Sequence, residues 1–269
     1  MTYRVVVPVD TNESRARHQA RYVDRLATAD TTIEATVLHV VRETESDTAF
    51  SSVDAAVAAA DDLEAAGIEV TRAIEAGPRS AVIVRLVDEL DANEIVTGGR
   101  KRSGVAKVLL GSTVTDVLLS ADRPVTITGK RVELGEGPLH ALVPVDHDRD
   151  RARQQVEYVS ALPGGPDGVG VTVLHVFEHL DYAGAPHHEF DEIDAAVETA
   201  GALEDRGFAV DRVAIGGEIA RTILEAADSR DVDTIVMAGR KRSGLQRVIL
   251  GSTSHDVILS AHRPVTLTG

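Results

Sequence analysis

The chain has no cysteine and no tryptophan, and aromatic residues make up only 3% of its 269 residues. Without cysteine it can form neither a disulfide, nor a thiolate metal site, nor a cysteine nucleophile. No apolar run reaches the roughly 18 residues that a transmembrane helix needs. An apolar strand pattern begins at residue 4, which leaves no room for a signal peptide. We therefore expect a cytoplasmic protein with no membrane partner.

Positive charge is also scarce. The sequence holds 43 acidic and 28 basic residues, a net charge of −15, and only four of the basic residues are lysine. Because nucleic acids and anionic membranes would be repelled, we exclude them as bulk partners. The acid surplus, the few lysines and the few aromatics resemble a protein of a salt-accumulating halophile, where a Debye length of about 3 Å screens self-repulsion. An acidic mesophilic protein is the alternative.

What the sequence does contain, it contains twice. The run at residues 5–10 recurs at 141–146, and later segments recur at a larger offset because the second copy has a longer loop after its second strand. Both copies close with Arg-Pro-Val-Thr-x-Thr-Gly. The repeat predicts two domains, 1–129 and 139–269, joined by a glycine- and proline-containing linker at 130–138.

Each copy alternates strands and helices in the same order. In the first copy we expect strands at 4–9, 33–41, 69–75, 95–97 and 125–128 and helices at 12–29, 51–66, 79–92 and 112–122. This alternation favours a parallel sheet with right-handed crossovers and helices on both faces. We therefore predict an α/β fold of two tandem domains, each with a doubly wound five-stranded parallel sheet.

Ligands of such sheets bind beyond the carboxyl ends of the strands. Asp10 follows the first strand of the first copy and Asp146 that of the second. Either aspartate could cap the following helix or bind a ribose hydroxyl or a metal. His39 and His175 lie inside strands, where a core position is the simpler interpretation.

A glycine-rich basic loop follows the fourth strand, and a helix opens after it with Gly-Ser-Thr. Glycine allows close approach of the backbone and positive φ, and the free N–H groups of a helix start favour an anion. We interpret the segment as a phosphate site, with an ordinary helix cap as the alternative. The residues concerned are Gly98, Arg100, Lys101, Gly111, Ser112 and Thr113, and in the second copy Arg240, Lys241, Gly251, Ser252 and Thr253.

Several well-defined sites are excluded by spacing. Gly99 and Gly104 have the spacing of a P-loop, but Val105 and Ala106 stand where Lys-Ser/Thr is required. No G-x-G-x-x-G follows a strand, and no Ser-His-Asp order or zinc-binding glutamate–histidine pair occurs. With no evident general base, we expect at most slow ATP hydrolysis.

The chain resembles the universal stress protein family over nearly the whole of both copies. The resemblance rests on the order and spacing of the run that ends in Asp10, the glycine-rich basic loop, the Gly-Ser-Thr helix start and the closing Arg-Pro-Val-Thr. The resemblance implies strand order 3-2-1-4-5, binding of ATP or AMP with or without Mg²⁺, and dimerisation through the last strand. In this chain it implies an internal pseudo-dimer, with self-association through 125–128 and 265–268. The resulting prediction is a nucleotide-binding stress protein without efficient catalysis. The alternatives are a nucleotide-free dimerisation scaffold and, with least support, an ATP pyrophosphatase or adenylyl transferase.

The resemblance also implies individual roles. Asp10 and Asp146 match the family aspartate near the adenosine, and Val40 and Val176 match the position whose backbone contacts the adenine edge. Pro8 belongs to the same first-strand motif.

The phosphate signature is incomplete in both copies. Its first glycine is Gly98 in the first copy but Ala238 in the second, and its second glycine is replaced by Lys101 and Lys241. Lysine there either adds a charged phosphate contact or fills the pocket. The first copy keeps more of the signature, so we expect it to bind nucleotide more readily.

Overall fold

The computed structural model describes residues 2–99, 110–129, 135, 137–178, 188–241 and 248–269. The first copy comprises β1 (Thr2–Val9), α1 (Glu13–Arg25), β2 (Thr32–Val41), α2 (Asp54–Ala65), β3 (Glu69–Ala76), α3 (Arg79–Glu89), β4 (Glu94–Gly98), α4 (Ser112–Ser120) and β5 (Val125–Thr128). The second comprises β6 (Leu139–Pro144), α5 (Arg149–Ala161), β7 (Val169–Glu178), α7 (Asp194–Glu204), β8 (Ala209–Gly217), α8 (Ile219–Ser229), β9 (Thr234–Ala238), α9 (Ser252–Ser260) and β12 (Val265–Thr268). The short elements are the 3₁₀ helices Glu43–Glu45, Phe50–Ser52 and Phe190–Glu192, helix α6 (Gly165–Gly168), and strands β10 (Arg240–Lys241) and β11 (Val248–Ile249).

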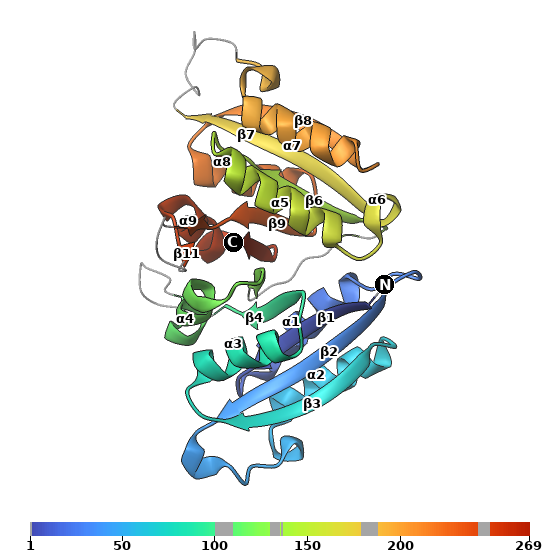
Figure 1. Ribbon diagram of the computed structural model, residues 1–269, viewed down its shortest axis with the longest axis vertical. Coiled ribbons are helices and arrows are strands. Elements are labelled where there is room, and N and C mark those ends of the chain that lie inside the picture. Colours follow the sequence, from blue (N-terminus) through green and yellow to red (C-terminus); the bar gives the residue numbers. More distant parts are fainter. Residues whose placement is uncertain (1, 100–109, 130–134, 136, 179–187, 242–247) are drawn as a thin grey trace.

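All ten long strands form one sheet that runs through both copies (Figure 1). Its order is β3-β2-β1-β4-β5-β12-β9-β6-β7-β8, which confirms the predicted order 3-2-1-4-5 in each copy. Neighbouring strands are parallel, except that β5 and β12 pair antiparallel, with Thr126 opposite Thr266. The two copies thus form the predicted internal pseudo-dimer through their last strands. The small β10–β11 ribbon was not predicted.

Helices cover both faces of the sheet because its strands are apolar on both sides. Val5 and Val7 of β1 belong to the core under α1, α2, α5 and α7, whereas Val6 belongs to the core under α3, α4, α8 and α9. Each of these two cores continues from the first copy into the second. A continuous apolar run is what a strand buried on both faces requires. Among the described residues, no helix is long and apolar enough to cross a membrane.

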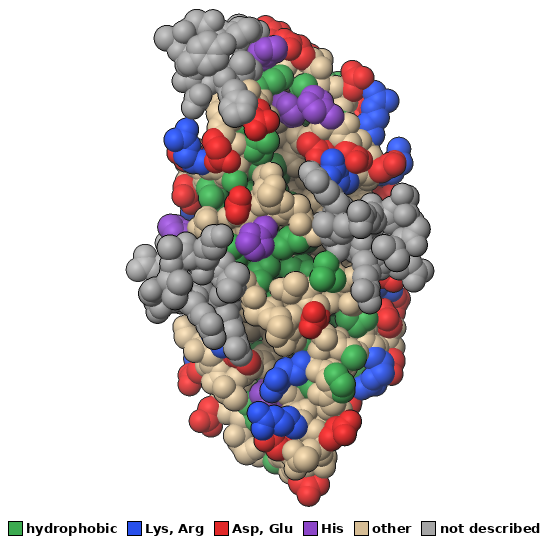
Figure 2. Space-filling view, turned by 90° about the vertical axis from the view of Figure 1, so that its left-hand side faces the viewer, with side chains coloured by type: hydrophobic (Ala, Val, Ile, Leu, Met, Phe, Trp, Pro, Cys, Tyr) green, Lys and Arg blue, Asp and Glu red, His purple; other side chains and the backbone are tan. Residues whose placement is uncertain are grey.

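Local signals set the helix ends near the predicted positions. The side chain of Asn12 accepts the N–H of Arg15 and caps α1. Helix α2 ends before Gly67, which has a φ of +82°, a backbone angle that glycine adopts without strain. Acidic and basic side chains intermingle over the visible surface (Figure 2), and many arginines form ion pairs with carboxylates.

A buried carboxylate lies where the two copies meet. Glu94 of β4 is completely buried and accepts hydrogen bonds from the hydroxyls of Tyr3 (2.8 Å) and Tyr158 (3.2 Å), the latter on α5 of the second copy. Thr126 also donates to Glu94, and its hydroxyl lies 2.6 Å from that of Thr266 across the β5–β12 pair. Burial raises the pKa of the Glu94 carboxyl, and the hydroxyl donors offset part of that effect.

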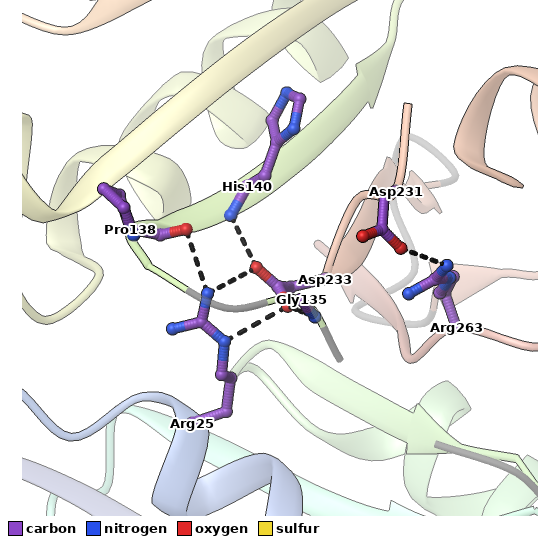
Figure 3. Close-up of polar contacts among 7 residues, drawn as sticks. All are labelled: Arg25, Gly135, Pro138, His140, Asp231, Asp233 and Arg263. Carbon is purple, nitrogen blue, oxygen red and sulfur yellow. Dashed lines mark hydrogen bonds and ion pairs between the residues drawn. The ribbon is translucent and has the colours of Figure 1, made fainter. Parts of the chain in front are cut away.

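A second polar contact joins the two copies (Figure 3). Arg25 of α1 donates to both carboxylate oxygens of Asp233, at 3.1 and 2.8 Å, and Asp233 has only 1% of its side chain exposed. The same carboxylate accepts the backbone N–H groups of Gly135 and His140. Because every acceptor is used, this buried ion pair is well compensated and fixes the chain between the copies.

The pH dependence of stability tests the state of Glu94. The unfolded carboxyl titrates near 4.5 and the folded one at a higher pH, so the folded state binds more protons between the two values. Unfolding free energy should therefore fall as pH rises through that window, and Glu94→Gln should remove this component. Urea titrations across pH measure it, with exposed Glu69→Gln as control. Equal pH slopes for wild type and Glu94→Gln would contradict the assignment.

Candidate functional site

The site begins where two neighbouring strands separate. β1 and β4 pair only at Val5–Glu94 and Val6–Ile95, although β1 continues to Val9 and β4 to Gly98. The buried amide of Gln19, on α1, spans the opening and donates to the carbonyls of Pro8 and Val96, both at 2.8 Å. Two carbonyls that face the opening between β1 and β4 thus keep a hydrogen-bond donor.

A cavity of about 350 Å³ occupies this opening in the first copy. Its lining comes from the end of β1, the first half of α1, the end of β2, the start of α3, the end of β4 and the start of α4. It gathers seven of the residues predicted from the sequence: Pro8, Asp10, Val40, Gly98, Gly111, Ser112 and Thr113. Arg100 and Lys101 lie outside the described residues. Residues 38, 83 and 114 supply apolar walls.

The second copy repeats the arrangement on a smaller scale. Gln155 donates to the carbonyls of Pro144 and Val236, both at 2.8 Å, and a cavity of about 270 Å³ lies beside it. Asp146, Val176, Gly251 and Thr253 line this cavity, whereas Ser252 is not among the lining residues. Arg240 and Lys241 form β10, of which only the backbone is described.

The two aspartates at the strand ends are held by arginine. Asp10 forms an ion pair with Arg15, and its other carboxylate oxygen accepts the N–H of Asn12 at 2.9 Å. Asp146 pairs with Arg151 at 2.6 Å. The helix caps themselves are Asn12 and Asp148, so Asp10 and Asp146 shape the turn before the helix and do not cap it. Both carboxylates border their cavities.

Neither Gly98 nor Gly111 has a positive φ, and at Gly98 the missing side chain allows neighbouring side chains to pack close to the backbone. Gly111, the residue before α4, has φ −63° and ψ 147°, an ordinary extended conformation. A Cβ on Gly98 would lie 3.2 Å from the Gln19 amide oxygen and from Cδ of Arg15. Ala238 carries that Cβ in the second copy.

The two strand histidines line their cavities and also contact the neighbouring strand end. Nδ1 of His39 lies 2.9 Å from the carbonyl of Val9, and Nδ1 of His175 lies 2.8 Å from that of Val145. Each ring thus ties the end of the second strand to the first. Burial lowers the pKa of His175, which favours the neutral ring.

Sequence reasoning missed Arg15 and Gln19 as site residues. Both are polar residues of a helix with many other polar residues, so nothing in their chemistry distinguishes them from a solvated face. The repeat itself held the signal, since Arg-Ala-Arg-x-Gln recurs in α5 with Arg151 and Gln155 in the same places.

A family model gives the same division of the chain. The model of the universal stress protein family matches residues 1–129 and again 139–269. The chain belongs to the universal stress protein family.

Individual universal stress proteins are more distant. The protein Rv2005c of Mycobacterium tuberculosis is 25% identical over 182 residues, covering 65% of this chain and 61% of its own length. The chain therefore spans about three fifths of that relative. A universal stress protein structure from Archaeoglobus fulgidus has a TM-score of 0.68 at 23% identity, covering 98% of this chain and 97% of the other. Protein PA1789 of Pseudomonas aeruginosa has a TM-score of 0.66 at 15% identity, covering 98% and 92%. Both structural likenesses concern the fold.

The amide of Gln19 makes a testable contribution to this universal stress protein fold. Gln19→Met keeps the length of the side chain but leaves the carbonyls of Pro8 and Val96 without their donor, which should lower the free energy of unfolding by about 1–3 kcal/mol. Urea denaturation measures the loss. Asp24→Asn, at an exposed position of the same helix, is the control, and an equal, small effect of both changes would show that Gln19 does not hold the fork.

Proposed function

We propose that the chain is a stress-response protein that binds an adenine nucleotide, ATP or AMP, in the first-copy cavity without efficient catalysis. The observation that supports this most is that one cavity gathers Asp10 and Val40 with the Gly111–Thr113 helix start. These are the positions that the family resemblance assigns to the adenosine and to the phosphates. The volume falls within the usual range of small-molecule sites, about 300–1,000 Å³.

The adenine end of the ligand has a suitable edge and suitable walls. The last register pair between β1 and β2 is Val9–His39. Beyond His39, the edge of β2 that faced β1 therefore borders the cavity. Val40 therefore presents backbone groups to a base edge. Leu38 and Ile83 supply apolar surface against its ring faces.

The phosphate end has a helix start with spare donors. Gly111 precedes α4 and provides no side-chain cap, so the first N–H groups of the helix remain for a ligand. Ser112 and Thr113 add hydroxyl donors. A Mg²⁺ ion carried by the phosphates would be part of the ligand.

The lining argues against efficient hydrolysis. Among its described residues the acidic groups are Asp10, paired with Arg15, and Glu45, whose carboxylate lies 3.7 Å from the guanidinium of Arg42. Neither carboxylate is a free general base, and without one only slow hydrolysis is expected.

A second candidate function is an interaction scaffold, and one observation favours it. β5 and β12 already pair with each other, so the edge through which family members dimerise is used inside the chain. We propose that the internal pair replaces a two-chain dimer.

The acidic, lysine-poor composition of the chain supports a halophilic, cytoplasmic setting, in which high salt screens the charge of −15.

Gly111→Asp tests the phosphate position without endangering the fold. Aspartate suits a helix N-cap and changes helix stability by only a few tenths of a kcal/mol relative to glycine, but it places a negative charge where the phosphates would bind. ATP affinity should fall at least about tenfold, which is about 1.4 kcal/mol. Calorimetric titration of the full chain at high salt measures it.

Matched variants separate charge from shape. Gly111→Asn has the same shape as the aspartate but no charge and should keep most of the affinity. Gly251→Asp makes the same change before α9 and should leave binding at the first copy unaltered. If ATP does not bind the wild-type chain, and mass spectrometry finds no adenine nucleotide released from freshly purified protein, the proposed function is wrong and the scaffold is favoured.

A further inference from the structure

The two cavities differ at the start of the helix that follows the third strand. In the first copy α3 has Pro78 before it and Arg79 as its first residue, whereas α8 has Glu218 and Ile219 in these places. Arg79 lines the first cavity and Ile219 the second. The same position of two matching sites therefore carries a cation in one copy and an apolar side chain in the other.

The caps of these two helices also differ, because only α8 is capped by a carboxylate. The carboxylate of Glu218 accepts the N–H groups of Ala220 (3.2 Å) and Arg221 (2.8 Å), so the start of α8 already holds an anion of the protein itself. Pro78 offers α3 no side-chain acceptor. Because a helix start favours negative charge, the start of α3 remains available to an anionic ligand, whereas that of α8 is occupied.

The turn before α3 fixes the position of Arg79. The N–H of Gly77 donates to the carbonyl of Val41 at 3.1 Å, which ties the turn to the end of β2 at the rim of the cavity. Gly77 has a φ of +139°, and a Cβ there would lie 3.2 Å from Cγ2 of Val82. Glycine is thus needed for this close turn, and the turn sets Arg79 at the mouth of the site.

Arg79 brings positive charge that nothing described nearby neutralises. The arginines on either side of it along the chain are paired: Arg72 with Asp61 and Glu64, and Arg85 with Glu75 and Glu89. Among the described residues no carboxylate lies within ion-pair distance of Arg79, although acidic groups are spread over the surface (Figure 2).

The rest of the first cavity does not cancel this charge. Asp10 and Arg15 neutralise each other, and Glu45 lies near Arg42. An arginine guanidinium can donate two parallel hydrogen bonds to a phosphate, so it suits a phosphorylated ligand better than an uncharged one.

We propose that Arg79 makes the first cavity selective for phosphorylated adenine ligands over the uncharged nucleoside. The second cavity, lined by Ile219 at the matching position, lacks this selectivity and accepts a nucleoside as readily as a nucleotide. The proposal rests on the proposed function and adds the residue that determines ligand charge.

Isoleucine-methyl NMR of the full chain can follow each cavity separately, because Ile83 lines the first and Ile223 the second. ATP, AMP and adenosine are titrated into wild type, Arg79→Leu and Arg79→Lys at one fixed salt concentration. A fourth chain carries Glu218→Pro with Ile219→Arg and so copies the start of α3 into the second copy.

Measured by the Ile83 signal, Arg79→Leu should weaken ATP binding to the first cavity about tenfold and leave adenosine affinity within about twofold of wild type. Arg79→Lys should keep part of the ATP affinity. At Ile223, the grafted pair should strengthen ATP binding several-fold. Equal losses of ATP and adenosine affinity in Arg79→Leu, no loss of either, or no gain in the grafted chain would contradict the role of Arg79. A wild-type Ile83 signal that responds to none of the three ligands would instead reject the proposed function, and this inference with it.

Discussion

The separation of β1 from β4 after Val6 is the constraint on which the site depends. A parallel sheet brings the carboxyl ends of all its strands to one edge, but only where neighbouring strands diverge does a space open between them. The backbone groups exposed by that divergence must still be satisfied. Gln19 and Gln155 do this in the two copies with the same pair of 2.8 Å hydrogen bonds. Residues far apart in the sequence therefore surround one cavity, while two carbonyls at the opening keep their donor.

The junction between the copies solves a different problem. The last strand of each copy would be an exposed sheet edge, and such edges invite unwanted pairing. β5 and β12 cover each other, and both apolar cores continue across the pair. Glu94 and Asp233 place buried carboxyl groups at this junction, where each has several hydrogen-bond donors. The pairing leaves both cavities at the carboxyl edges of their own halves, so one chain holds two sites that are free to diverge.

Much of this architecture is predictable from the sequence, because the strands buried on both faces are continuous apolar runs and the whole pattern occurs twice. Seven residues that line the first cavity were predicted, from a strand end, from the Gly-Ser-Thr helix start with its glycine-rich loop and, for Pro8 and Val40, from the family resemblance. What could not be predicted depends on tertiary contacts. Glu94 looks like a surface acid at the start of a strand, since its donors come from three other elements, one of them in the second copy. Arg79 looks like an ordinary helix residue until two facts are seen together: it lines the cavity, and it has no carboxylate partner within the described part of the chain.

The central claim is that one nucleotide extends from the β2 edge to the start of α4 in the first copy. A crystal structure of the full chain grown with ATP at high salt tests it most directly. The account predicts adenosine density beside Val40 and Asp10, with the phosphates at the backbone N–H groups of Gly111 to Thr113. Density for ATP only elsewhere on the chain, or phosphates turned away from α4, would contradict it.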